Sequence, residues 1–132
     1  MGFAPNPIQS YQNVGFETDI RGSDPHRLII LLFEGALAAL DRAEAGLAAN
    51  NFLDKTNALT RAIEIILDGL GASLNIEAGG EVAANLKALY DYMASRLTHA
   101  NFNNDLGAIQ EVRGLLSELS DAWKEIAPKS AT

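Results

Sequence analysis

Apolar side chains recur along most of this chain with the spacing of amphipathic helices. They return at alternating steps of four and three residues, and polar residues occupy the other positions. Breaks in the pattern separate four stretches. The four predicted helices run from about Pro25 to Leu47, from about Leu53 to Leu74, from about Glu81 to Ala100, and from the polar run 101–104 to about Ile126.

Each predicted helix carries one apolar seam. The seam residues are Ile29, Phe33, Ala36, Leu40, Ala43 and Leu47 in the first helix; Leu59, Ile63, Ile66, Leu70 and Leu74 in the second; Val82, Leu86, Leu89, Met93, Leu97 and Ala100 in the third; and Ile109, Val112, Leu116, Leu119, Trp123 and Ile126 in the fourth. Helices of about 20 residues are about 30 Å long and pack well side by side. Because their connections are short, neighbours run antiparallel, and the sequence predicts an all-α, up-down-up-down four-helix bundle.

Three segments follow from where the helical pattern begins and ends. Residues 1–23 contain Pro5 and Pro7 among polar residues and glycines, which predicts an irregular N-terminal segment. This segment still carries spaced apolar side chains, so it is either a loosely packed terminus or a displaceable lid over a groove. Residues 24–127 are the predicted bundle. Residues 128–132, beginning at the proline that stops the last helix, are expected to be a disordered C-terminus.

Six consecutive apolar residues, Leu28 to Phe33, lie just inside the first predicted helix, for which Asp24 or Ser23 is the expected N-cap. Six side chains in succession surround the helix, whereas a surface helix buries one stripe. The outer side of this helix therefore needs a cover. That cover is the N-terminal segment, a second copy of the chain, or another protein.

Other large apolar side chains also fall off the seams when the helices are drawn at 100° per residue. They are Leu28, Ile30, Leu31 and Leu37 in the first helix, Ile65 in the second, Tyr92 in the third and Leu115 in the fourth. These residues either widen the core or line apolar grooves between helices. Grooves of this kind receive an amphipathic helix or an extended peptide, so the seven residues are candidate binding residues.

The composition of the chain excludes several classes of function. The net charge of -7 and ten scattered Lys and Arg residues argue against nucleic-acid binding. The chain has no cysteine, which excludes disulfides and thiolate chemistry. It shows neither a secretory leader nor an apolar run near the length of a membrane span, so a cytoplasmic protein without membrane insertion is expected.

Four-helix bundles also include di-metal enzymes, so catalytic motifs bear on the function. Such sites need Glu-x-x-His on two helices, and that motif does not occur in the sequence. His26 and His99 have no second ligand at metal-binding spacing. Nucleophile-elbow and phosphate-loop motifs do not occur either. The sequence predicts a protein that is not an enzyme and that uses no metal or cofactor.

Several short motifs together resemble the FliS family of flagellar export chaperones, over nearly the whole chain. The motifs are Tyr11-Gln12 with Val14, Asp24-Pro25-His26-Arg27-Leu28-Ile29, Leu32-Phe33-Glu34-Gly35-Ala36-Leu37, Ala62-Ile63 with Ile65-Ile66, Ala72-Ser73-Leu74, Gly79-Gly80-Glu81, Leu89-Tyr90-Asp91-Tyr92-Met93, and Ala100-Asn101 with Asn104-Asp105. The resemblance implies a cytoplasmic bundle that binds the disordered C-terminal segment of flagellin, prevents premature polymerisation and passes flagellin to the flagellar type III export apparatus. It also implies that the N-terminal segment, here with Tyr11 and Val14, lies over part of the client site.

Two functional hypotheses are therefore carried forward. The first is a secretion chaperone for flagellin, a monomer or weak homodimer, with export-apparatus components as further partners. The second is a structural or regulatory bundle that covers its apolar patches by self-association and has no flagellin client. A one-to-one complex with a flagellin C-terminal peptide supports the first hypothesis, and a dimer that ignores the peptide supports the second.

Overall fold

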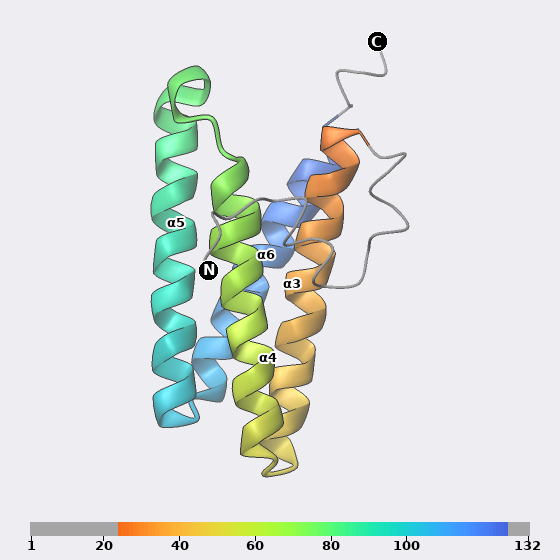
Figure 1. Cartoon of the computed structure of the whole chain (residues 1–132), viewed down its shortest axis with the longest axis vertical. Coiled ribbons are helices and arrows are strands. Elements are labelled where there is room, and N and C mark those ends of the chain that lie inside the picture. Colours follow the sequence, from red (N-terminus) through yellow and green to blue (C-terminus); the bar gives the residue numbers. More distant parts are fainter. Residues whose placement is uncertain (1–23, 127–132) are drawn as a thin grey trace, which may run out of the picture.

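The computed structural model describes residues 24–126, and these residues form helices joined by short turns (Figure 1). The elements, in order, are α3 (Pro25–Ala48), α4 (Phe52–Glu64), the π-helical segment η1 (Ile65–Leu70), the 3₁₀ turn η2 (Gly71–Ser73), α5 (Ile76–Asn103) and α6 (Leu106–Glu125). This confirms the all-α bundle. The expectations for residues 1–23 and 127–132, including Tyr11 and Val14, lie outside the described residues.

Each long helix lies between two others. α3 packs against α4 and α6, and α5 packs against the same two helices from the other side, so α3 and α5 are diagonal partners. Consecutive helices run in opposite directions in Figure 1. The N-terminal end of α3, the C-terminal end of η1, the N-terminal end of α5 and the C-terminal end of α6 therefore meet at one end of the bundle.

Side-chain caps start the helices. The Asp24 carboxylate accepts from the Arg27 backbone N–H at 2.8 Å, so Asp24, one of the two expected candidates, is the N-cap before Pro25. Asn51, Asn75 and Asp105 cap α4, α5 and α6 in the same way. The cap of the last helix was expected within 101–104, but it is Asp105, because Asn104 takes a left-handed conformation (φ 48°) that ends α5.

The second predicted helix is not α-helical to its end. After Glu64 the chain continues as η1 and then η2, so the regular pattern stops about ten residues before the expected end at Leu74. Gly69 permits close approach to α3 here, since a Cβ at this position would lie 2.9 Å from Leu32 Cδ2. The Ser73 hydroxyl donates to the Gly69 carbonyl at 2.7 Å and closes the last turn.

The third helix begins earlier than expected and contains a kink. Asn75 caps a first turn starting at Ile76, and Gly80 then takes a non-helical conformation (φ 55°, ψ −130°). A side chain would clash with the backbone in this region, so glycine is required there. The expected start at Glu81 is where the straight part of α5 begins.

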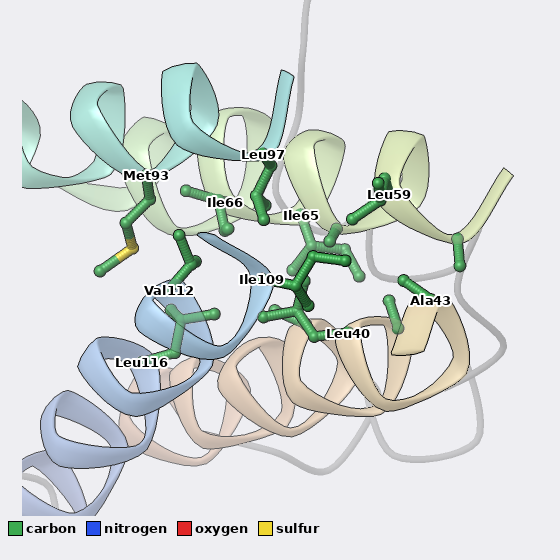
Figure 2. Packing of buried hydrophobic residues seen from close by; sticks show 14 of the residues in the cluster. Leu40, Ala43, Leu59, Ile65, Ile66, Met93, Leu97, Ile109, Val112 and Leu116 are labelled. Atoms are coloured by element: carbon green, nitrogen blue, oxygen red, sulfur yellow. The ribbon is translucent and has the colours of Figure 1, made fainter. Parts of the chain in front are cut away.

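The seam residues form the core. Figure 2 shows side chains from all four helices directed toward one another, among them Leu40, Leu59, Met93 and Ile109. Each of these four is fully buried. The apolar spacing therefore correctly identified the inward face of each helix in the middle of the bundle.

Two off-seam residues are buried, contrary to the outward position expected for them. Leu31 is 4% exposed and Ile65 is 1% exposed, and both belong to the core cluster. Ile65 opens the π-helical segment, in which residues advance by less than 100°, so the helical wheel does not apply. For Leu31, the helical wheel gives the side of the helix on which the side chain lies. It does not show whether another part of the fold covers that side.

Candidate functional site

An apolar groove of about 320 Å³ lies at the end of the bundle where α3 and α5 begin and η1 and α6 end. The described residues that line it are Ile29, Phe33, Leu70, Ser73, Leu74, Val82, Leu86, Tyr90, Leu119, Ala122, Trp123 and Ile126. Apart from Ser73, Tyr90 and Ala122, all of them are predicted seam residues. The groove is thus the continuation of the core at the end where the four helices leave space.

Val82 illustrates why the groove is open. It lies in line with the buried Met93 on the inward side of α5, yet it is 68% exposed. Among the described residues, no side chain covers it, because α5 has just left the kink at Gly80. Ile126, where α6 has already ended, is also exposed and lines the same groove. Inward-facing apolar surface is therefore accessible at this end.

The groove has little polar character. None of its described lining residues carries a charge. The Ser73 hydroxyl is already bonded to the Gly69 carbonyl. Tyr90 is buried, and that burial raises the pKa of its phenol to about 12, so it is neutral at pH 7. Such a groove suits apolar side chains and disfavours charged ones.

The candidate binding residues predicted from the sequence lie elsewhere. Leu28, Leu37 and Leu115 are half-buried and pack against the core, and Ile30 is also half-buried. Neither these four nor Leu31, Ile65 and Tyr92 are among the residues that line the groove. The sequence pattern does not reveal the groove, because the residues that line it have the same seam spacing as the core residues. The one available signal was Gly79-Gly80, which interrupts the helix beside Val82.

Tyr92 is 44% exposed and takes part in a polar cluster between α5 and α6. Its hydroxyl donates to Glu111 Oε2, and Arg96 Nε donates to Glu111 Oε1 at 2.9 Å. The hydrogen bond from Tyr92 and, to a smaller extent, the one from Arg96 hold the pKa of the Glu111 carboxyl below its usual value. The same bond to Glu111 raises the pKa of the Tyr92 phenol. Tyr92 thus presents an aromatic face with its hydroxyl already engaged.

The two histidines have identifiable partners. His26 stacks on Trp123, and His99 Nε2 lies 3.0 Å from Asp105 Oδ2, beside the cap of α6. Among residues 24–126, no group of three or more His, Cys, Asp or Glu side chains is placed to hold a metal ion. Within the same range, no helix has both the length and the apolar character needed to cross a membrane.

Comparison with known proteins gives matches over nearly the full length. The family described as "Flagellar protein FliS" matches residues 7–130. The Flagellar secretion chaperone FliS of Salmonella typhimurium is 46% identical over 129 residues, which are 98% of this chain and 96% of that protein. The protein of the same name from Escherichia coli is 41% identical, covering 93% and 90%. That from Bacillus subtilis is 32% identical, covering 91% and 85%.

Proposed function

This chain belongs to the FliS family of flagellar proteins, and we propose that it is a flagellar secretion chaperone that works in the cytoplasm. In this role it binds the disordered C-terminal segment of flagellin, prevents premature polymerisation and passes flagellin to the export apparatus. A chaperone of this kind needs a binding surface and no catalytic centre. It is therefore not an enzyme.

The observation that carries the proposal is the apolar groove. A disordered segment that orders on a host loses conformational entropy, and burial of apolar side chains must offset that loss. The groove supplies uncovered inward-facing residues such as Val82 and Ile126, without a charged group among its described lining. Apolar side chains of the client, spaced along a helix or an extended stretch, fill it.

The N-terminal segment is proposed to lie over part of the same site, with Tyr11 and Val14 as its contacts. Supporting this, residues 1–23 join the bundle at Asp24, directly before Pro25 and His26. His26 contacts Trp123, which lines the groove. The point from which the segment extends is therefore close to the rim of the groove.

A client longer than the groove also contacts the outer faces of the helices. We propose Leu28, Ile30 and Leu37 on α3 for these contacts. Tyr92 and Leu115 are proposed for the α5–α6 face. All five keep part of their surface accessible. Leu31 and Ile65 are left out because they are buried in the core.

The test is titration of the full chain with a synthetic peptide of the flagellin C-terminal segment, followed by calorimetry and light scattering. We expect a one-to-one complex. A constant dimer that ignores the peptide would instead support the self-associating bundle. The groove is tested with Val82→Asp, which should weaken binding by about tenfold or more, because the peptide's apolar side chains would meet a charge.

The matched control is Leu53→Asp. Leu53 is 73% exposed in the first turn of α4, at the other end of the bundle, so the change in charge and in exposed apolar area is similar. Both variants should keep the wild-type stability to within about 0.5 kcal/mol. If the two variants weaken binding equally, the groove is not the preferred site.

A further inference from the structure

The first turn of α3 and the last turn of α6 are held together by a clasp of two residues, His26 and Trp123. The indole Nε1 of Trp123 donates to the His26 carbonyl at 3.0 Å. In return, His26 Nε2 lies 2.9 Å from the Trp123 carbonyl, and since a carbonyl only accepts, Nε2 carries the proton. The two rings are stacked, with centroids 5.0 Å apart and an interplanar angle of 18°.

The clasp sits at the edge of the groove. Trp123 lines the groove together with Ala122 and Ile126, and α6 ends directly after it, at Glu125. This last turn is also held by the bond from the Ile126 N–H to the Trp123 carbonyl, at 3.2 Å, and by an exposed ion pair between Lys124 Nζ and Glu34 Oε2, at 3.6 Å. An indole at a helix end has rotamer freedom unless neighbouring groups restrict it. The His26 imidazole provides a stacking surface for the indole, and its Nε2–H holds the backbone carbonyl of Trp123, from which the indole projects.

We propose that His26 is a positioning residue for the groove: its imidazole holds the Trp123 indole in place as one wall, so that the groove is already shaped before a client enters. Pre-organisation of this kind improves affinity because less side-chain freedom is lost on binding. The client-affinity part of this inference rests on the proposed function. The effect on Trp123 itself does not.

The sequence makes the test direct, because Trp123 is the only tryptophan of the chain. Its fluorescence therefore reports the clasp without a label. In the full chain without peptide, His26→Ala should shift the emission to longer wavelength and increase quenching by acrylamide, since the indole becomes more accessible to water. With the flagellin C-terminal peptide, the same variant should raise Kd by about fivefold to tenfold, from the typical strength of an aromatic stack.

Three further variants separate positioning from simple stability. His26→Phe keeps a ring for stacking and should restore most of the emission and affinity. His26→Gln keeps a donor but has no ring, and should restore little. Arg27→Ala, at the exposed neighbouring position of the same turn, should behave as wild type in both measurements. His26→Phe and His26→Gln also answer the question if His26→Ala does not fold.

The outcomes for the clasp and for the proposed function are distinct. In one outcome, the wild type binds the peptide and the His26 variants show the same emission, quenching and Kd as the wild type. That result would overturn the positioning role of His26 alone. A lower melting temperature without any change in emission or Kd would also overturn it, because His26 would then be only structural. If the wild type ignores the peptide while His26→Ala alters the emission, the proposed function fails and the positioning of Trp123 stands.

Discussion

Lys55 Nζ donates to Asn104 Oδ1 at 2.7 Å and so ties the start of α4 to the turn between α5 and α6. The same ammonium group donates to the Asn101 carbonyl at 3.0 Å. Lys55 is buried although it is charged, and its partners come from a turn whose residue Asn104 is left-handed. This contact closes the end of the bundle opposite the groove.

Replacing Lys55 with methionine keeps the apolar stem and removes both hydrogen bonds. We expect the free energy of unfolding in urea to fall by about 1–3 kcal/mol, because two partly buried hydrogen bonds from a charged donor are lost. Affinity for the flagellin peptide should not change, since the groove lies at the other end. Lys87→Met, which removes an exposed ion pair with Asp91, is the control and should cost less than about 1 kcal/mol. Equal losses for both variants would contradict the role given to Lys55.

Leu31→Asp should prevent stable folding. Leu31 is in the core cluster, and an aspartate there loses the apolar contacts and buries a charge, for a cost of at least about 3 kcal/mol. Circular dichroism and thermal melting measure this. Ala38→Asp places the same charge at an exposed position of α3 and should melt near the wild-type temperature. A folded Leu31→Asp protein that only loses peptide binding would return Leu31 to the client surface.

Ser120→Ala should stabilise the bundle. Ser120 is 2% exposed in α6, and its hydroxyl oxygen has no hydrogen-bond partner in the part of the chain that the structure describes. Removing a buried unpaired hydroxyl is expected to add up to about 1 kcal/mol to the free energy of unfolding, measured in urea. Ser117→Ala on the same helix is partly exposed and should change it by no more than about 0.5 kcal/mol. A clear destabilisation by Ser120→Ala would mean that the hydroxyl makes a needed bond.

The Glu111 cluster should contribute stability that disappears in acid. Hydrogen bonds from Tyr92 and Arg96 lower the pKa of Glu111 below its usual 4.5 in the folded protein. A lowered pKa means that the contribution is complete above the usual pKa and is lost as the pH falls from there through the lower pKa of the folded protein. Wild type should therefore be more stable than Glu111→Gln near neutral pH, and the difference should shrink from about pH 5 downward. Glu118→Gln, the same change on the same helix, provides the comparison; a difference that is constant with pH would rule out the carboxylate as its source.

The family and the fold were predictable from local signals. Short motifs such as Leu89-Tyr90-Asp91-Tyr92-Met93 predicted the FliS resemblance, and the full-length matches confirm it. Cap residues such as Asp24 marked a helix start because the capping bond joins a side chain to backbone only a few residues away. The π-helical segment was not predictable, because the contact of Gly69 with Leu32 that accompanies it joins residues far apart in the sequence.

The apolar character of the candidate site was predictable from the sequence, but its location was not. The sequence predicted more apolar surface than one stripe per helix needs, but placed it on the flanks at residues such as Leu31 and Ile65. The structure instead has uncovered apolar surface on the seam, at Val82 and its neighbours. A seam residue in the core and a seam residue in the groove have the same spacing, and only the neighbouring helices distinguish them.

The sequence by itself therefore determined that the chain forms four helical stretches, which side of each faces inward in the middle of the bundle and which family the chain belongs to, because these depend on spacing and on local bonds. The tertiary structure decided where the inward faces of the helices pack against one another and where they stay accessible. Within residues 24–126, the kink at Gly80 and the end of α6 leave one end of the shared core uncovered. Burial depends on what every other segment occupies, so the same leucine or valine is core in the middle of the bundle and binding surface at its end.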